Sequence, residues 1–276
     1  VRGRALVSMV DASGIAEGPL GRGHRGSWLM SARKSYLDLV LQRLYPDQTV
    51  NFGYYDMQPK LTWSVSDRHQ IQVAGTAGRS HLALPPNEIS NPGGLRDAFN
   101  ESGVGVLSWR YAKSPRLLLV QRAAIAANNF RNVSRDGPVL DDGTSRDAVY
   151  RAEWSSVLAR RLSMEAGGEA RWVQADGSEQ TVSGGKLLVR ERFSADANRQ
   201  GAYLSARVEL GGATLTPGVR VDRWSLPGAI AASPWVQLGI PLSHGLLLKA
   251  GSGVYRQAPG LAQLAGIRGA SSLMPS

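Results

Sequence analysis

The sequence contains no cysteine, so disulfide bonds and thiolate metal sites are excluded. It also lacks the run of about 18 consecutive apolar residues that a transmembrane helix needs. Basic runs of five or more residues are absent, and the arginines are dispersed among acidic residues. The net charge of +10 would permit a nucleic acid or an anionic membrane as partner. Since no helix-turn-helix pattern and no aromatic RNP-type strand is present, we expect no nucleic-acid partner.

Signatures of catalysis are missing as well. The histidines are scattered, with neither an H-E-x-x-H motif nor metal-ligand spacing, and no G-x-S-x-G elbow occurs. The acidic pair Asp141-Asp142 stands in a Gly-rich stretch that favours a turn. Gly21, Gly23 and Gly26 match G-x-G-x-x-G, but a strand pattern follows them where the dinucleotide motif requires a helix. We therefore expect no enzyme, no cofactor and no metal site.

Glycine, by contrast, is abundant, and its spacing suits turns between strands. The organising stretch is 201–257, in which Ala202, Leu204, Ala206, Val208 and Leu210 alternate with polar residues. Gly211-Gly212 supplies a two-residue turn, and alternation resumes through Val219 and Val221. A second hairpin follows, with strands over 234–241 and 246–257. Long strands joined by a tight turn, then a looser connection, form the repeating unit.

The same rhythm recurs through the chain. Strand pairs are expected over 54–65 and 69–78, over 103–112 and 116–128, and over 148–155 and 163–172. Residues 81–101, 129–146, 175–198 and 258–276 are polar and turn-rich, which predicts long loops. One helix is predicted, over 35–44, with Ser35 as its N-cap.

The pattern predicts an all-β fold, an antiparallel up-and-down transmembrane β-barrel with about twelve strands, short periplasmic turns and long extracellular loops. Most strands are about 9–11 residues or longer, the length that crosses a bilayer when tilted. The charged face lacks the apolar residues of a soluble core. Tyr150, Trp172, Trp224 and Tyr255 stand near strand ends, where an interfacial aromatic girdle would place them.

Three segments resemble barrel strands of TonB-dependent outer-membrane receptors. They are Gly26-Ser-Trp-Leu-Met-Ser-Ala-Arg with the preceding Gly18-Pro-Leu, Tyr55-Asp-Met-Gln-Pro-Lys-Leu-Thr-Trp, and Pro217-Gly-Val-Arg-Val-Asp222 followed by Ser233-Pro234 and Gly253-Val-Tyr-Arg-Gln-Ala-Pro. The resemblance implies a barrel of about 22 strands closed by an N-terminal plug. It also implies uptake of a scarce ligand, such as an iron chelate, a vitamin or a glycan, driven by an inner-membrane energy complex.

The sequence departs from that family in showing no plug, no energy-coupling box and no terminal aromatic strand. Both ends look cut, so residues 1–276 are expected to be a partial barrel domain that lacks the plug and the C-terminal strands. The partners that the resemblance implies are outer-membrane lipid, the inner-membrane TonB complex acting through the missing plug, and a small-molecule or oligosaccharide ligand. The expected location is the cell outer membrane.

Charged residues on the polar faces are the candidates for lining the barrel lumen, because they would be costly near the lipid midplane. Each can pair with its neighbours or with a plug, and the alternation selects no individual ligand-binding residue. The low-ranked binding candidates are Arg151, Glu153, Arg171, Arg207, Glu209, Arg220 and Asp222, and Glu165 and Glu169 share their face. Ligand capture is expected in the long loops.

Two other functions stay open at this point. A passive outer-membrane porin would use the same strands without a plug. A soluble extracellular β-sheet binding module would bury Leu204, Val208 and Leu210 under a second sheet.

Overall fold

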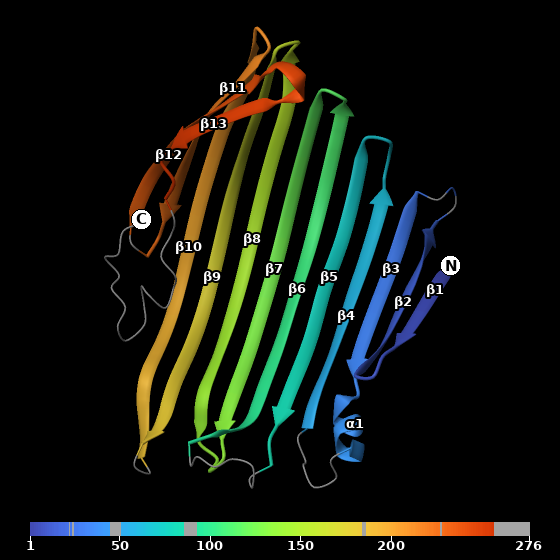
Figure 1. Cartoon of the computed structure of the whole chain (residues 1–276), viewed down its shortest axis with the longest axis vertical. Helices are drawn as coiled ribbons and strands as arrows, with labels where there is room; N and C mark the ends of the chain where they lie inside the picture. The colour runs from blue at the N-terminus through green and yellow to red at the C-terminus, as the bar shows by residue number, and fades with distance from the viewer. Residues whose placement is uncertain are drawn as a thin grey trace.

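The structure, a computed structural model, describes residues 1–21, 23, 25–44, 51–85, 93–183, 186–226 and 228–256. These residues form one sheet of thirteen strands, in which each strand pairs only with its neighbours in sequence. All pairs are antiparallel (Figure 1). The predicted all-β, up-and-down architecture is confirmed, with thirteen strands where the pattern gave about twelve.

The elements follow one another without a crossover. In chain order they are β1 (Arg2–Val7), β2 (Asp11–Leu20), β3 (Gly26–Ser35), α1 (Leu37–Leu44), β4 (Asn51–Ser64), β5 (His69–Ala83), β6 (Leu95–Ser114), β7 (Leu117–Ser134), β8 (Val139–Ala159), β9 (Leu162–Ser183), β10 (Lys186–Leu210), β11 (Ala213–Trp224), β12 (Ala229–Pro241), the short 3-10 helix η2 (Ser243–Gly245) and β13 (Leu247–Gly253). The predicted helix is α1, which buries no residue and decorates the β3–β4 connection.

The central strands are much longer than the pattern predicts. β8, β9 and β10 contain 21, 22 and 25 residues. Most of 129–146 and 175–198, predicted as long loops, is therefore strand, as are 81–83 and 95–101 of the loop predicted over 81–101, and the prediction was wrong there. These stretches are polar on both faces, so they carry no apolar alternation to mark them as strands. Residues 86–92 of the loop predicted over 81–101 lie outside the described residues, as does the fourth predicted loop, 258–276.

The two ends of the sheet differ. At one end, uppermost in Figure 1, the connections are tight, and at the other end lies α1. Gly211 and Gly212 have φ of 58° and 95°, as the predicted two-residue turn requires. Gly21 and Gly23 also have positive φ and belong to the β2–β3 turn, so the G-x-G-x-x-G match is a turn, as predicted.

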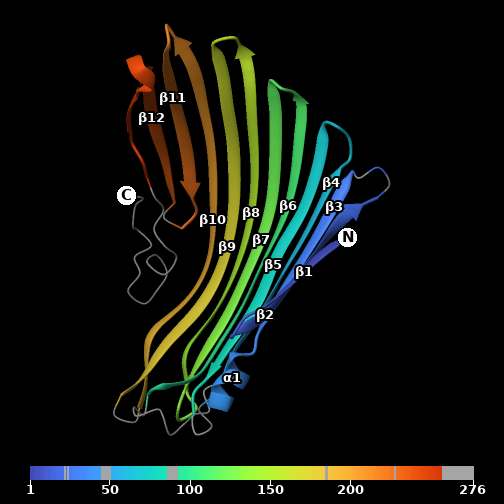
Figure 2. The same ribbon diagram turned by 45° about the vertical axis from the view of Figure 1, so that its right-hand side comes forward.

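The described residues form a single curved layer (Figure 2). Only four hydrophobic residues are buried among them: Ala195, Trp224, Ala229 and Ala231. The outermost strands, β1 and β13, are exposed along their whole length. A single layer with two open edges has unsatisfied apolar surface and unpaired backbone groups, so its environment must supply partners for both.

Candidate functional site

Cross-strand register sorts the side chains onto two faces with different chemistry. Leu204 of β10 pairs with Val219 of β11, and Val219 pairs with Pro234 of β12, so these three side chains share a face. Leu204 is 44% exposed and Val219 is 40% exposed. Among the described residues, one sheet alone is present, so Leu204, Val208 and Leu210 lie under no second sheet. The apolar face is therefore left open.

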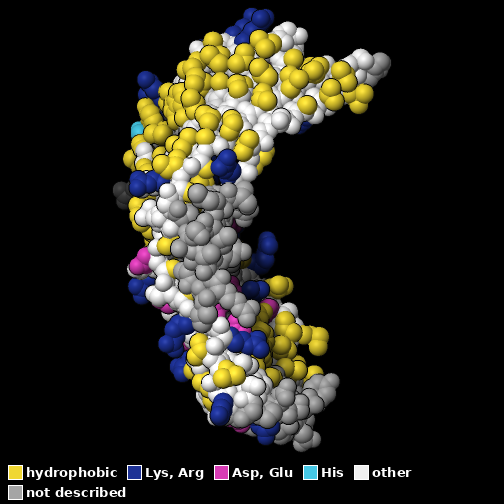
Figure 3. Space-filling view, turned by 90° about the vertical axis from the view of Figure 1, so that its left-hand side faces the viewer, with side chains coloured by type: hydrophobic (Ala, Val, Ile, Leu, Met, Phe, Trp, Pro, Cys, Tyr) yellow, Lys and Arg dark blue, Asp and Glu magenta, His cyan; other side chains and the backbone are white. Residues whose placement is uncertain are grey.

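The face that carries Leu204 and Val219 is apolar over only part of the strand length. On β9 it runs from Leu162 to Trp172, and beyond it the same face carries Gln174, Asp176 and Ser178. We call this zone the apolar belt. It consists of the outward residues of 55–63, 69–77, 103–111, 117–127, 148–156, 162–172, 202–210, 213–221 and 232–240. Hydrophobic side chains gather toward the upper end of the molecule in Figure 3.

Aromatic residues stand at both limits of the belt. Near the short turns, the His69 ring stacks on Tyr111 with ring centroids 4.5 Å apart. The indole nitrogen of Trp109 donates to Nδ1 of His69 at 3.2 Å. At the far limit, Tyr150 and Trp172 are 43% and 51% exposed on the apolar face. Such a band, apolar in the middle and aromatic at its margins, matches the dielectric profile of a bilayer.

One residue predicted for the aromatic girdle lies elsewhere. Trp224 is 5% exposed, and the β10–β11 register puts it on the polar face. Its assignment to the girdle was wrong, because proximity to a strand end does not determine the face on which a side chain lies. Tyr255 follows the last strand, so pairing register assigns it to neither face and its place in the girdle stays a prediction.

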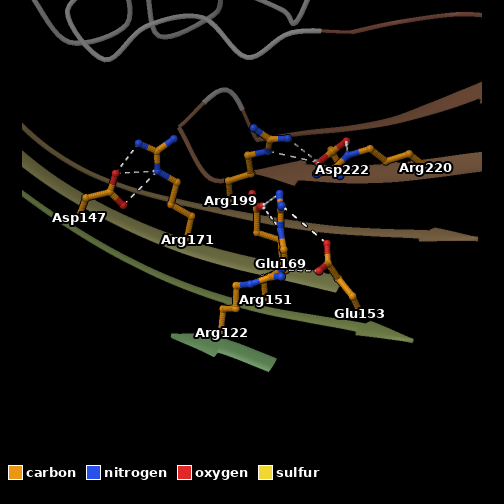
Figure 4. Close-up of polar contacts among 9 residues, drawn as sticks. All are labelled: Arg122, Asp147, Arg151, Glu153, Glu169, Arg171, Arg199, Arg220 and Asp222. Atoms are coloured by element: carbon orange, nitrogen blue, oxygen red, sulfur yellow. Dashed lines mark hydrogen bonds and ion pairs between the residues drawn. The ribbon is translucent and has the colours of Figure 1, made fainter. Parts of the chain in front are cut away.

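The polar face carries three groups of ion pairs on five adjacent strands, which we call together the ion-pair ladder (Figure 4). Its members are Arg122 of β7, Asp147, Arg151 and Glu153 of β8, Glu169 and Arg171 of β9, Arg199 of β10, and Arg220 and Asp222 of β11. All nine point to the same side of the sheet. Its ion pairs join β7 to β8, β8 to β9 and β10 to β11 on the face opposite the apolar belt.

The first part of the ladder brings two arginines together. Arg122 lies directly opposite Arg151 in the β7–β8 register. Glu153 resolves the repulsion, since it accepts from Arg122 at 2.5 Å and lies 3.8 Å from the Arg151 guanidinium. Arg151 also donates to Glu169 at 2.6 Å, directly across the β8–β9 pair. Charges therefore alternate along this stretch of the wall.

A second pair of opposed arginines is balanced by two separate carboxylates. Arg171 lies directly opposite Arg199 in the β9–β10 register. Arg171 donates from Nε to Asp147 at 2.9 Å and forms a second, shorter bond through Nη2. Arg199 donates to Asp222 at 3.2 Å, and Asp222 is only 3% exposed. Arg220 donates to the same carboxylate at 2.6 Å, so Asp222 is held by two guanidinium groups.

The ladder contains most of the predicted candidates. Arg151, Glu153, Arg171, Arg220 and Asp222 belong to it, as does Glu169. The other two, Arg207 and Glu209, lie near the β10–β11 turn and are exposed, and neither has an ion pair among the described residues. Arg207 instead lines a groove of about 680 Å³ on the polar face together with Thr214, Thr216 and Lys249.

Sequence reasoning missed Arg122, Asp147 and Arg199. Asp147 lies on the same face as Arg151 and Glu153, so extending the alternation of β8 toward its N-terminal end would have found it. Arg122 lies in a stretch that is apolar or small on both faces, with Leu117 to Val120 before it, and Arg199 lies in a stretch that is small or polar on both faces. For these two residues only the pairing register identifies the face.

Beyond the belt, the β8–β9 end carries concentrated negative charge. Asp141 lies opposite Glu179 in register, and Asp142 follows it directly. Burial raises the pKa of the Asp141 carboxyl, and the nearby charges of Glu179 and Asp142 raise this pKa further. Asn132 donates a long hydrogen bond of 3.5 Å to Asp141, which opposes these effects.

Every carboxylate of the ladder forms an ion pair with an arginine. In the part of the chain that the structure describes, no group of three or more His, Cys, Asp or Glu side chains could hold a metal ion. Among the described residues, no helix has the length and apolarity to cross a membrane.

The comparisons with known proteins bear on the fold alone. No protein-family model and no curated protein matches the chain. Solved structures do match. The siderophore receptor PirA from Acinetobacter baumannii aligns with a TM-score of 0.67 and 13% identity, over 95% of this chain and 43% of that receptor.

Two further receptors give the same result. A variant of the ferric enterobactin receptor PfeA from Pseudomonas aeruginosa aligns with a TM-score of 0.66 and 16% identity, over 95% of this chain and 44% of that receptor. FpvA from P. aeruginosa, bound to heterologous pyoverdines, aligns with a TM-score of 0.67 and 11% identity, over 87% of this chain and 39% of that receptor. The chain thus has the fold of a TonB-dependent receptor barrel wall and spans less than half the length of the receptors it matches.

Proposed function

We propose that this chain is part of the wall of an outer-membrane receptor that takes up a scarce ligand with energy from a TonB complex. The observation that carries the proposal is the opposition of the two faces. The same strands place the apolar belt on one side and the ion-pair ladder on the other. A transmembrane barrel needs this arrangement, with lipid outside and a polar interior.

The belt has the dimensions that this function requires. Leu162–Trp172 covers eleven positions of β9, and a tilted strand crosses the hydrocarbon core in about 9–11 residues. A charged side chain on the lipid face near the midplane costs about 2–4 kcal/mol. None of the ladder residues lies on the lipid face. The strand segments beyond Trp172 would then project from the membrane on the side opposite the short turns.

The open edges support a larger barrel. β1 and β13 are exposed, and each pairs with a neighbour on one side only among the described residues. A membrane wall cannot leave the unpaired outer edge of such a strand in lipid. In the proposed receptor, further strands pair with both edges, and a plug packs against the polar face and couples to the energy complex. The ladder residues, including Arg151, Glu153, Arg171, Arg220 and Asp222, line that interior, and Arg207 and Glu209 line it nearer the short turns.

The names of the matching receptors suggest a class of ligand and not a specific one. The names of the matching receptors specify siderophores and ferric enterobactin. We therefore place an iron chelate ahead of a vitamin or a glycan as the ligand. Recognition would occur at the strand ends beyond the belt, because segments that project from a rigid scaffold carry binding function.

The test uses the complete open reading frame expressed in a Gram-negative host. We expect the product in the outer-membrane fraction, with gel migration that shifts on boiling, as a closed barrel gives. We also expect it to restore growth under iron limitation with a ferric siderophore, and this growth to require the TonB complex. A soluble product that does not shift on boiling would overturn the barrel. Uptake that is independent of the energy complex would favour a passive porin.

A further inference from the structure

The short turns carry a one-sided charge. Among the described residues, connections at this end contribute five basic residues, Arg25, Arg68, Arg116, Arg160 and Arg161, and one acidic residue, Asp67. At the opposite end, the described connections carry two basic residues, Arg43 and Arg135, and two acidic residues, Asp38 and Asp136. The excess of positive charge is therefore specific to the short-turn end.

Four of these arginines occupy the same position in successive hairpins. Arg25, Arg68, Arg116 and Arg161 each immediately precede a returning strand, β3, β5, β7 and β9 respectively. We call this set the arginine rim. Neighbouring strands lie about 4.7–4.9 Å apart, and successive turns at this end are separated by two strands, so the turns repeat about every 10 Å along the edge. The rim is thus a regular row of cations.

Backbone hydrogen bonds fix each member of the rim. The carbonyl oxygen of Arg68 accepts from the amide of Ala112 at 2.9 Å, and that of Arg116 accepts from Val157 at 2.8 Å. Equivalent bonds join Ser64 to Arg25 at 2.7 Å and Glu209 to Arg161 at 2.9 Å. Each turn is therefore held by the next hairpin through its backbone. The guanidinium of Arg25 adds a long hydrogen bond of 3.5 Å to the carbonyl oxygen of Val65.

The guanidinium groups have no acidic partner. All four side chains are exposed, and none forms an ion pair within the described part of the chain. This distinguishes them from the ladder arginines, each of which forms an ion pair with a carboxylate. An exposed row of unpaired cations is suited to a surface of opposite charge.

The rim adjoins the aromatic margin of the apolar belt. His69, Trp109 and Tyr111 stack on the lipid-facing side within a few residues of Arg68, and the Ala112 amide that bonds to Arg68 follows Tyr111 directly. Aromatic side chains of this kind lie at the level of lipid headgroups. The cations therefore lie at the depth of the lipid headgroups. The aromatic margin beside them favours a lipid surface over a soluble acidic protein as their partner, because a soluble protein would not need an adjacent apolar surface.

The geometry points to the arginine rim as a binding surface for the headgroups of anionic phospholipids in the membrane leaflet at the short-turn end. This inference rests on the proposed membrane wall. Each rim arginine offers paired N–H donors to a phosphate. The aromatic stack holds the adjacent acyl region, and the row of turns anchors the wall at a fixed depth.

The experiment compares phosphatidylglycerol with phosphatidylethanolamine as probes. The complete gene product is purified in detergent, mixed with each lipid, and assayed by native mass spectrometry for bound lipid. The rim variant combines Arg25→Gln, Arg68→Gln, Arg116→Gln and Arg161→Gln. The control removes four exposed cations at the other end, through Arg43→Gln, Lys186→Gln, Arg190→Gln and Arg192→Gln. Both variants lose the same charge.

We expect the wild type and the control to prefer phosphatidylglycerol, and the rim variant to lose about tenfold or more of that preference, given the contribution of each basic residue near an anionic surface. The preference should also weaken with salt. Equal preference in all three proteins would overturn the inference, as would equal loss in both variants. Loss of a co-purifying acidic protein with unchanged lipid preference would overturn it in favour of a protein partner.

The outcomes separate this inference from the proposed function. Outer-membrane fractionation and migration on boiling are recorded for each variant before the lipid assay. If the wild type is soluble and does not shift, the membrane wall fails and the lipid inference fails with it. If the wild type inserts but binds both lipids equally, only the lipid inference fails.

Discussion

Arg122 and Arg151 lie directly opposite each other in the β7–β8 register, and one carboxylate, that of Glu153, holds both. Two like charges at opposed positions destabilise a strand pair. The ladder tolerates them because an acidic neighbour lies diagonally across. In the second opposed pair, Arg171 and Arg199, each arginine instead bonds to a carboxylate of its own, Asp147 and Asp222 respectively. A slip of one residue in register would turn these charges onto the apolar belt, so the ladder also fixes the register.

The first prediction concerns Glu153. Glu153→Gln leaves the two opposed arginines without their shared counterion, and we expect it to destabilise the barrel by about 1 kcal/mol, the scale of a partly exposed ion pair. Adding Arg122→Gln should recover most of that loss, because the repulsion disappears. The urea midpoint of the boiling-sensitive gel shift measures both. A double variant less stable than Glu153→Gln alone would contradict the arrangement.

The second prediction tests the two faces with adjacent residues. Leu204→Arg places a charge on the apolar belt near its middle and should cost about 2–4 kcal/mol, reducing assembly in the outer membrane. Ser205→Arg, the matched control, adds the same charge to the polar face, and assembly should stay near the wild-type level. The boiling-sensitive fraction is the readout. Equal effects at both positions would show that the two faces are not lipid and lumen.

Alternation predicted the faces but not the full strand lengths. Where one face is apolar and the other charged, as from Ala202 to Leu210, the period of two is evident in the sequence. Beyond Trp172 both faces are polar, so strand and loop have the same composition there. The long loops expected over 129–146 and 175–198 were wrong for this reason. Backbone pairing, which sequence does not display, continues the strands into that region.

The candidate site was predictable in its composition and not in its pairing. Arg171 bonds to Asp147, which lies diagonally across from it, while the residue directly opposite is Val149. Such partners depend on register and on rotamers of long side chains. The same limit explains why Arg199 was missed: its role depends on Asp222, 23 residues away in sequence.

The third prediction concerns pH. The pKa of Asp141 is raised above its ordinary value of 3.8, mainly by burial. A group with a raised pKa in the folded state stabilises it fully below the unfolded pKa, and this contribution is lost as pH rises through the folded pKa. Asp141→Asn should therefore be more stable than the wild type at neutral pH, and the difference should vanish below pH 3.8.

Urea midpoints across a pH series measure that difference. Asp136→Asn, in the neighbouring β7–β8 turn, removes the same charge and serves as the control. A difference between Asp141→Asn and the wild type that persists unchanged in acid would contradict the assignment, because both proteins are then neutral at this position.

The last prediction concerns a close approach on the polar face. Gly218 lies directly opposite Trp235 in the β11–β12 register, and a Cβ at Gly218 would lie 2.2 Å from Cζ2 of that indole. Gly218→Ala should therefore displace the ring and cost about 1–3 kcal/mol, as overpacking does. The control is Gly239→Ala in β12, where the nearest atoms lie 4.0 Å away. There alanine should be neutral or stabilise by about 0.5–1 kcal/mol, since glycine weakens a strand.

The same substitution is also tested in a variant that lacks the indole. With Trp235→Ala already present, the ring is gone, and Gly218→Ala should cost nothing further. The urea midpoint of the gel shift for the four proteins gives the coupling between the two positions. If Gly218→Ala costs the same with and without the indole, the tryptophan does not occupy the space above Gly218, and the stacked arrangement on the polar face is wrong at this point.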